Sequence, residues 1–571
     1  MLIASLFNGH DAGACLTNNG EVLVHIQKER ITRVKEAGGS AEECLQLCLD
    51  ETGIDFSEVD VVASSVFIHP TDSTYEIPLY TKRFGLFDTY RPIGAEYRGV
   101  NGTYFGTNKV WSKHNIRLFG QIKPAYMVHH HISHAAVAFY TSPFDEALIW
   151  TPDGGGDDAS AVLAVGRGNQ IEVFDWNREY ALGGAWTGYC ENNYGWSHRR
   201  NFDEDVSWSE GRTGNLQNYS GHYAGSLMAL ASYGKPDYLD EVLSDIQSGK
   251  ARQGFRDGLN LEDKQSDLSK NVASSLQKAT EHLFLEAVTR LYNKYQIKQL
   301  CLAGGCAYNC LSNTVVLQET QMKEVYVPPI PEDAGLCVGQ ALYTYYHILN
   351  HPRLKETSSY SPYKGRGFSS KQIETCLQDN SDQLQWRPST LDEVADLLQD
   401  GKVIGFFHGR SETGKRALGN RSVLADPRRH ELKEQMNEIV KHREWFRPFA
   451  PTILDEYCDE YFTPRVQSPY MSFLATVKED KRNDVPAVLH VDNTARPQTL
   501  KRDSNPTYYD LIDKFRQRTG VPMLLNTSFN DREPIVDSPT DAIRCFLNTN
   551  MDYIYFQGTL AWKRQSSEEL T

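Results

Sequence analysis

The sequence lacks the features that mark membrane, secreted and disulfide-rich proteins. No apolar stretch in its 571 residues approaches the length that spans a bilayer, so we expect no membrane partner. The apolar start carries no basic leader and predicts a first strand rather than a signal peptide. The eleven cysteines form no CxxC motif, which favours reduced thiols in a cytoplasmic protein.

Positive charge is also in deficit. The chain has 59 lysines and arginines against 74 aspartates and glutamates, which gives a net charge of −15. The electrostatic field of this net negative charge repels the phosphates of nucleic acids except where cations cluster. We therefore expect no nucleic-acid partner.

The composition, with 40% hydrophobic and 23% charged residues, is that of a folded chain too long for a single core. Residues 351–366 are polar and rich in Pro, Ser and Gly, which is typical of a linker. We predict a first domain over residues 1–350 and a second over 367–571. A polar stretch near 236–268 is expected to be an irregular surface insertion.

A pattern of strand, Asp/Gly turn, strand, Gly turn, strand occurs twice. The first copy contains "LIASLF", "NGHDAG" and "EVLVHI", and the second contains "EALIWTP", "DGGGDDAS" and "AVLAVG". The repetition indicates an internal duplication. Helical periodicity over 272–291 and strand-like runs at 299–303 and 324–329 then predict a layered α/β domain with its site at the strand ends.

His130 and His134 are four residues apart in a segment that predicts a helix, so their imidazoles would share one face. Asp153 and Asp333 each follow a predicted strand and could reach the same point. Two histidines and two carboxylates suit iron(II), manganese or zinc better than copper. For the histidine pair alone, ordinary surface or hydrogen-bonding residues are the commoner explanation, and we expect His129 and His131 to be structural.

The two Asp/Gly turns offer backbone N–H groups that could hold phosphate oxygens, although such a hairpin needs no ligand. His10, inside the first turn, could act as a base or a hydrogen donor. Lys35 could supply a positive charge, and a solvated surface lysine is the alternative.

The second predicted domain concentrates cations among small residues and aromatics. Guanidinium and ammonium groups around one pocket suit a phosphate-bearing small molecule, whereas a solvated basic helix is the alternative. The interleaved Trp445, Phe446 and Phe449 favour a buried pocket wall. The cations are Arg410, Lys415, Arg416, Arg421, Lys441, Arg443 and Arg447.

Taken in order along nearly the whole chain, nine motifs resemble the NodU/CmcH family of O-carbamoyltransferases. They are "NGHDAG", "HHISHA", "PDGGGD", "AGGCAYN", "PEDAG", "GRSETGKRALGNRSVLADPR", "KHREWFRPFAP", "RPQTL" and "LNTSFN". Any one of them is weak, but their joint occurrence is specific. The family usually has an aromatic residue and a proline where this chain has Thr413 and Lys415, so the shape of that loop is expected to differ.

The resemblance implies a duplicated N-terminal domain of the actin/sugar-kinase (ASKHA, RNase H-like) type and a C-terminal YrdC-like α/β domain. It implies that carbamoyl phosphate and ATP, with Mg²⁺, give carbamoyl-adenylate in the C-terminal domain. The carbamoyl group would then pass to a hydroxyl of a small natural product beside Fe²⁺, with Mn or Zn as alternatives. A homodimer is the assembly considered.

The resemblance also assigns site residues. The metal ligands would be His130, His134, Asp153 and Asp333, and His10 would assist the transfer. Lys35 is a second catalytic candidate on the strength of its charge, not of the resemblance. The nucleotide and carbamoyl phosphate would contact Gly305, Asn309, Arg416, Lys441, Arg443, Arg447, Arg496, Ser528 and Asn530.

Two other functions share parts of these patterns. A threonylcarbamoyl-type tRNA-modifying enzyme would share both fold types, but it would need a basic track for phosphates, against which the acidic total argues. An ATP-dependent small-molecule kinase of the ASKHA type would share the duplicated domain alone. The acceptor classes of the family include aminoglycosides, ansamycins, cephems, modified chitin oligosaccharides and guanidinium alkaloids, and the sequence does not choose among them.

Overall fold

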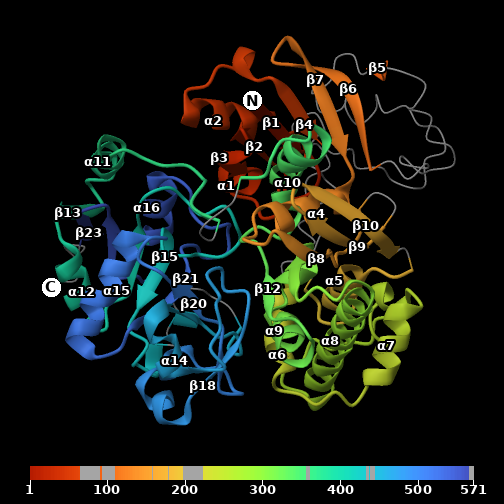
Figure 1. The fold of residues 1–571 in the computed structure, drawn as a ribbon. Helices are drawn as coiled ribbons and strands as arrows, with labels where there is room; N and C mark the ends of the chain where they lie inside the picture. The colour runs from red at the N-terminus through yellow and green to blue at the C-terminus, as the bar shows by residue number, and fades with distance from the viewer. Residues whose placement is uncertain are drawn as a thin grey trace. The chain divides into compact units, whose positions relative to one another are not determined.

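The computed structural model describes residues 1–64, 91–92, 110–156, 159–177, 179–196, 223–354, 360–432, 436–437 and 444–564. The chain divides into two compact units, Met1–Tyr360 and Ser361–Thr571. Figure 1 colours them from red to green and from green to blue. All eleven cysteines are free thiols, as expected from the absence of CxxC motifs. Among the helices of the described residues, none has the length and apolar character needed to cross a bilayer.

The first unit contains two sheets with one topology. In each, three consecutive strands form an antiparallel meander, and two later strands extend the sheet in parallel with its first strand. This repetition confirms the predicted internal duplication. The shared orders are β3-β2-β1-β4-β7 and β10-β9-β8-β11-β12, and β6 and β5 continue the first sheet.

The bounds of these strands follow the sequence pattern closely. Both meanders alternate apolar runs with Gly- or Asn-containing turns, and most residues of these strands are buried. The first sheet comprises β1 (Leu2–Phe7), β2 (Gly13–Asn18), β3 (Glu21–Gln27), β4 (Val61–Ser64), β5 (Arg91–Pro92), β6 (Trp111–Leu118) and β7 (Gln121–Val128). The second comprises β8 (Glu146–Trp150), β9 (Ala161–Arg167), β10 (Gln170–Asn177), β11 (Gln299–Leu302) and β12 (Glu324–Tyr326).

Two equivalent helices lie against these sheets and pack on each other. Helix α10 (Leu336–Tyr343) contacts β1, β2 and β4, whereas α4 (His130–Tyr140) contacts β8, β9 and β11 (Figure 1). Gly339 lets them approach closely, because a Cβ there would lie 1.9 Å from the carbonyl oxygen of Ser133. Both helices are almost wholly buried, which suits their mainly apolar sequences.

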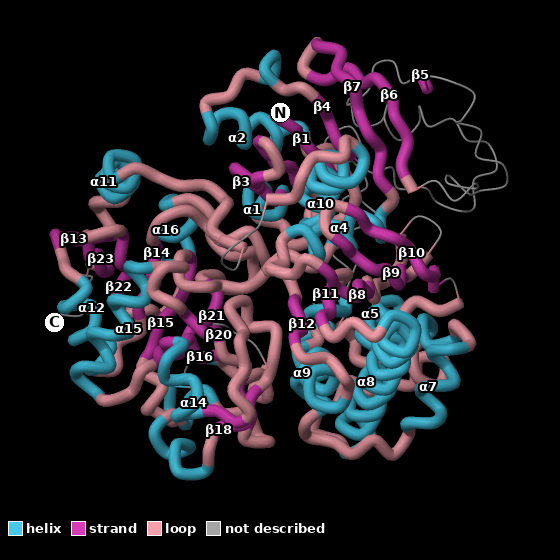
Figure 2. The backbone as a smooth tube through the Cα atoms, in the orientation of Figure 1, coloured by secondary structure: helices cyan, strands magenta, loops and turns pink. Residues whose placement is uncertain are grey.

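Further helices cover the outer faces. Helix α2 packs on β2 and β3, and the long helix α8 packs on α6, α7, α9 and β8 (Figure 2). Their bounds are α2 (Glu42–Thr52), α5 (Leu182–Asn192), α6 (Ala224–Ala231), α7 (Leu239–Gln247), α8 (Asp267–Tyr295) and α9 (Cys310–Glu319). Helix α8 contains the whole predicted periodic segment.

The prediction of an irregular insertion near 236–268 is wrong in part, because α7 lies within it. Val242 and Ile246, four residues apart, turn inward and are buried at 0% and 1% exposure. Phe255 is also fully buried, and its N–H donates to the side chain of Asn193 over 2.7 Å. The polar composition conceals a short amphipathic helix that belongs to the core of the first unit.

The second unit is built on an eight-stranded mixed sheet of order β13-β23-β22-β14-β15-β21-β16-β20. Its bounds are β13 (Leu384–Pro388), β14 (Ile404–Phe407), β15 (Arg421–Ala425), β16 (Ala450–Leu454), β20 (Gln498–Leu500), β21 (Met523–Ser528), β22 (Tyr553–Phe556) and β23 (Thr559–Lys563). Helices α11 (Ser370–Asp379), α12 (Leu391–Gln399), α15 (Pro506–Thr519) and α16 (Pro539–Leu547) pack around it (Figure 2). The predicted α/β class holds for both units.

Candidate metal centre

The histidine-rich segment forms the start of α4, directly after β7. His129 caps the helix by accepting the N–H of His131 over 3.2 Å. The spacing of four residues brings the imidazoles of His130 and His134 onto one face, with ring centroids 4.8 Å apart. Both side chains are essentially inaccessible to solvent, at 1% and 0% exposure.

Two aspartates reach the same point from strand ends. Asp153 follows β8 in the glycine turn, and Asp333 opens the short helix Asp333–Gly335 that leads into α10. Gly156 leaves room for His130, since a Cβ at that glycine would lie 2.3 Å from the imidazole. The side chains of Asp153 and Asp333 are 10% and 3% exposed.

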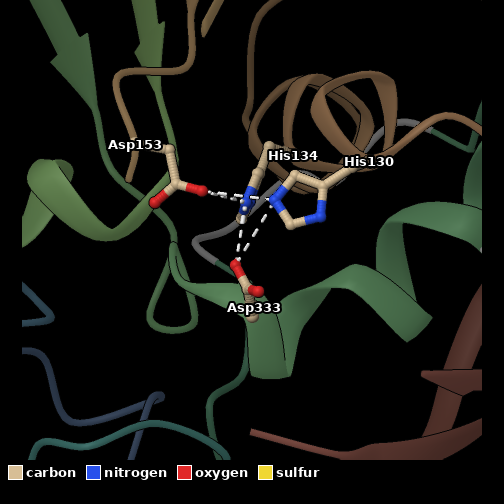
Figure 3. Close-up of side chains that lie close together, drawn as sticks. All are labelled: His130, His134, Asp153 and Asp333. Carbon is tan, nitrogen blue, oxygen red and sulfur yellow. Dashed lines mark hydrogen bonds and ion pairs between the residues drawn. The ribbon is translucent and has the colours of Figure 1, made fainter. Parts of the chain in front are cut away.

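These four side chains point toward one another (Figure 3). Nε2 of His130 lies 3.2 Å from Oδ2 of Asp153 and 3.5 Å from Oδ1 of Asp333. Nε2 of His134 lies 3.6 Å and 3.2 Å from the same two oxygens. One ligand atom from each of the four residues falls within 4.8 Å of all the others, so all four could hold one ion.

The charges of the cluster compensate one another. Burial by itself raises the pKa of Asp153, but the adjacent imidazoles of His130 and His134 outweigh it and hold that pKa well below its usual range. Burial lowers the pKa of His134, and the two carboxylates overcome this and raise it to about 9. The proton on His134 therefore supplies positive charge that a bound divalent cation would replace.

The donor set fits such a cation. Within the described part of the chain, the buried Nε2 of His134 makes no hydrogen bond, although carboxylate oxygens lie within 3.6 Å of it. The convergence of this nitrogen with the other three ligand atoms would let all four bind one cation. Two nitrogen and two oxygen donors suit Fe²⁺, Mn²⁺ or Zn²⁺.

Neighbouring backbone and side-chain groups hold the ligands in place. The N–H of Gly305, in the loop after β11, donates to Oδ1 of Asp153 over 2.9 Å. The ring of His131 turns away from the cluster, with Nε2 2.8 Å from the carbonyl oxygen of Ala159. His129 and His131 are thus structural, as expected.

His10 lies at the edge of the cluster and contacts one of the four residues. Its Nε2 is 3.2 Å from Oδ2 of Asp333, and its Nδ1 is 3.1 Å from Oδ2 of Asp11. Burial lowers the pKa of His10, but Asp333 and Asp11 outweigh this and raise it to about 10. Its side chain is 18% exposed, so a second molecule could reach it.

Lys35 is half-buried in the turn that follows the short helix Lys28–Thr32. This turn is fastened to the loop of His10, because the N–H groups of Asp11 and Ala12 donate to the carbonyls of Glu36 and Ala37. The structure therefore brings the segment of Lys35 beside that of His10.

Gly305 and Asn309 have structural contacts of their own. The N–H of Gly305 holds Asp153, and the side chain of Asn309 accepts the N–H of Ser312 over 3.0 Å at the start of α9. The amide of Asn309 also exchanges hydrogen bonds with Gln277 over 2.8 and 3.2 Å.

In the second unit, the predicted phosphate contacts have different degrees of exposure. Arg416 and Arg496 are half-buried, and Arg447 pairs with Glu444 over 3.6 Å. Ser528 donates to Oδ1 of Asn530 over 2.7 Å at the end of β21. Lys441 and Arg443 lie outside the described residues.

Other cations of this group serve the fold. Arg421 is fully buried, stacks on the ring of Phe407 at 3.6 Å and donates to the carbonyl of His408 over 2.8 Å. Arg410 donates to the carbonyls of Gly365 and Lys364. Trp445 is 47% exposed, so the prediction that it forms a buried wall is wrong, whereas Phe446 and Phe449 are buried.

Sequence reasoning missed one residue of the site and the role of another. It did not single out Asp11, whose carboxylate contacts His10, although it directly follows that histidine in the "NGHDAG" turn. It also missed the structural role of the Gly305 N–H, for which no side-chain pattern could have given a signal.

Comparison with known proteins covers both units. Residues 4–342 match the model for the carbamoyltransferase N-terminus, and residues 395–563 match that for the carbamoyltransferase C-terminus. The nodulation protein NolNO of Sinorhizobium fredii is 34% identical over 98% of this chain and 80% of its own length. An uncharacterized protein of Synechocystis sp. is 33% identical over 96% of this chain and 94% of its own.

A solved structure of HypF from T. kodakarensis is similar at 14% identity, with a TM-score of 0.35, over 61% of this chain and 48% of that one. A likeness of that size supports no argument. The two family matches alone assign the chain to a family, because the first spans more than half of the chain and the second covers most of the second unit. The chain belongs to the carbamoyltransferase family, and it is a carbamoyltransferase.

Proposed function

We propose that this carbamoyltransferase is ATP-dependent and transfers the carbamoyl group to a hydroxyl of a small natural product. Carbamoyl phosphate, ATP and water first give carbamoyl-adenylate, pyrophosphate and phosphate. The acceptor hydroxyl then attacks the carbamoyl carbon, the bond to the AMP oxygen breaks, and the products are the O-carbamoyl compound, AMP and a proton.

The first step belongs to the second unit in this proposal. Arg416, Arg447 and Arg496, together with Lys441 and Arg443, would bind the phosphates of ATP and carbamoyl phosphate, with Mg²⁺ accompanying the nucleotide. Ser528 and Asn530, joined by a 2.7 Å hydrogen bond, would present polar groups at the end of β21. Gly305 and Asn309 would meet the nucleotide of the intermediate in the first unit.

The second step belongs to the cluster of His130, His134, Asp153 and Asp333. Fe²⁺ held by these residues, or Mn²⁺ or Zn²⁺ in its place, would supply Lewis acidity toward a carbonyl or hydroxyl oxygen. His10 would accept the proton of the acceptor hydroxyl through Nε2 once a bound cation offsets the charge of Asp333, which otherwise raises the pKa of His10 to about 10. Lys35 would add a positive charge beside the leaving phosphate.

For the two units we propose more specific fold types than the α/β class. The repeated strand order of the first unit, with α4 and α10 between its sheets, supports an ASKHA, RNase H-like domain. We assign the mixed sheet of the second unit to the YrdC-like type. The boundaries proposed from sequence are residues 1–350, a linker over 351–366 and residues 367–571.

One observation carries the function: a buried set of two histidines and two aspartates that can hold one cation, with a reachable histidine against it, in a carbamoyltransferase N-terminal domain. Such a site combines a Lewis acid with a proton acceptor, which is what acyl transfer to a hydroxyl needs.

Incubation with ATP and labelled carbamoyl phosphate tests the proposal. We expect pyrophosphate and AMP as products. ADP would instead indicate a kinase and would overturn adenylate chemistry. Mass spectrometry of hydroxylated natural products incubated with the enzyme would then identify the acceptor by its gain of one carbamoyl group.

A further inference from the structure

A loop over residues 408–420 connects β14 to β15 in the second unit. Its two ends are joined, because Phe407 pairs with Arg421 across the antiparallel strands. Within it, the turn over residues 413–417 contains Gly414 and no proline, so its sequence does not by itself restrict the backbone. Most of the loop is nevertheless buried, and its backbone polar groups therefore need partners inside the protein.

The carboxylate of Glu412 closes this turn. Its Oε1 accepts the backbone N–H groups of Leu418, Asn420 and Arg421 over 2.8, 2.8 and 3.2 Å. The residue is 2% exposed, and three donors on one oxygen offset the cost of burying the carboxylate. Residues 413–417 are thus enclosed between a side chain and the backbone that it binds.

Side chains from elsewhere in the second unit hold the carbonyls that adjoin the end of the turn. Nδ2 of Asn526 donates to the carbonyl of Ala417 over 3.1 Å. The carbonyl of Leu418 accepts Nε2 of Gln498 over 3.0 Å and the hydroxyl of Tyr363 over 2.8 Å. Because both N–H and carbonyl groups are bound here, the backbone that leaves the turn is fixed.

The loop ends at the same edge of the sheet as two other residues of the proposed phosphate site. Strand β15 pairs with β21 so that Ser422 lies opposite Ser528. The N–H of Phe529 donates to the carbonyl of Arg421 over 3.0 Å. The fixed loop therefore returns to the sheet beside Ser528 and Asn530.

We propose that Glu412 is a positioning residue for phosphate binding, a role that rests on the proposed function of Arg416. The half-buried Arg416 belongs to the turn that Glu412 closes. The carboxylate holds this turn in one conformation before the nucleotide binds, so the entropy of ordering the backbone does not oppose binding. Without the three hydrogen bonds, only a fraction of the protein would present Arg416 correctly.

Two substitutions of Glu412 separate the geometry of the side chain from its charge. Glu412→Asp keeps the charge, but its carboxylate is one methylene short of the three N–H groups. Glu412→Gln loses the charge, but its carbonyl oxygen can replace Oε1, and its NH₂ group can replace Oε2, which makes no hydrogen bond among the described residues.

Calorimetry measures the Kd of each protein for ATP with Mg²⁺. We expect the Kd to rise about 10-fold in Glu412→Asp and less than about 3-fold in Glu412→Gln. A wild-type Kd in Glu412→Asp, or an equal rise in both variants, would overturn the inference.

Asp552→Ala controls for a loss of stability. Oδ2 of Asp552 accepts the N–H of Val403 over 2.8 Å, directly before β14 and therefore at the opposite end of that strand from the loop. We expect a lower denaturation midpoint with an unchanged Kd for ATP. Binding as weak as in Glu412→Asp would show that reduced stability alone explains the effect, contrary to the inference.

Hydrogen exchange of the wild type tests the same claim without a substitution. We expect the peptide over residues 412–421 to exchange slowly in ATP-free protein and to gain little protection when ATP is added. Rapid exchange that ATP suppresses would show that the nucleotide orders the turn, and Glu412 would then not hold it in advance.

Arg416→Ala distinguishes the failure of this inference from that of the proposed function. A wild-type Kd for ATP in Arg416→Ala would refute the proposed phosphate contact and with it the role of Glu412. Weak binding in Arg416→Ala, combined with a wild-type Kd in Glu412→Asp, would refute the role of Glu412 alone. In the double variant, Glu412→Asp should raise the Kd less than about 2-fold beyond Arg416→Ala, because Glu412 acts through Arg416.

Discussion

The backbone N–H of Gly305 donates a 2.9 Å hydrogen bond to Oδ1 of Asp153, although 152 residues separate the two in sequence. This bond occupies one carboxylate oxygen, so Oδ2 is left to face His130 at 3.2 Å. The loop after β11 thereby orients a residue of the cluster that belongs to the loop after β8. Partners of this kind tune metal sites because they fix the direction of the ligand.

Replacing Gly305 with alanine should therefore weaken metal binding. A Cβ at this position would lie 3.1 Å from Oδ1 of Asp153, which is closer than ordinary van der Waals contact, so the carboxylate must shift. We expect the Kd for Zn²⁺ to rise about 10-fold, measured by competition with a chromophoric chelator.

Gly225→Ala controls for the change of residue type. Gly225 lies in α6, and among the described residues no atom beyond its chain neighbours and its own helix backbone lies within 4 Å of a Cβ built there. Its variant should bind Zn²⁺ as the wild type does. Equal affinity in Gly305→Ala and the wild type would show that the added Cβ does not displace the Asp153 carboxylate, and would contradict the prediction.

His347 should make the stability of the first unit depend on pH. It stacks on Tyr343, and its Nδ1 accepts the N–H of Ile171 over 3.2 Å. Burial lowers the pKa of His347 to about 4. Above pH 6.5 the ring is neutral in both states, but below it the unfolded chain binds a proton that the folded protein excludes, so stability falls as the pH drops toward 4.

Calorimetry of the wild type and of His347→Asn at pH 7 and pH 5 measures this effect. Asparagine can accept the same N–H without titrating. Screening by solvent reduces the contribution of His347. Between pH 7 and pH 5, we expect the free energy of unfolding of the variant to fall by about 1 kcal/mol less than that of the wild type. Equal losses of stability in the two proteins between pH 7 and pH 5 would contradict the lowered pKa of His347.

Arg421 should prove to be a structural cation rather than a phosphate ligand. Its guanidinium is fully buried against Phe407 and donates to backbone carbonyls, among them those of His408 and Gly409. A lysine ammonium cannot reproduce the planar set of donors of the guanidinium group. Arg421→Lys should therefore lower the free energy of unfolding of the second unit by about 3 kcal/mol.

The exposed Arg387, paired with Glu393, provides the matched control in the same unit. Its lysine variant should change stability by less than about 0.5 kcal/mol. A wild-type denaturation midpoint in Arg421→Lys, together with a raised KM for ATP, would place that arginine in the binding site instead.

Much of the site was predictable because it follows from local periodicity. The spacing of His130 and His134 fixes their shared helix face, and the apolar runs before Asp153 and Asp333 place both at strand ends. The contact between His10 and Asp333 joins opposite ends of the first unit, so no local pattern could reveal it. The burial of Arg421 was equally hidden, because Arg416, five residues earlier, has the same chemistry and is only half-buried.

The amount of metal bound per chain tests the central claim most directly. Protein reconstituted anaerobically with Fe²⁺ is freed of excess metal and assayed for iron, alongside His134→Asn. We predict one tightly held iron per chain in the wild type, an X-ray absorption spectrum that requires imidazole ligands, and no retained iron in the variant. Wild-type protein without bound metal, or a variant that retains iron with the same spectrum, would contradict the assignment of this cluster.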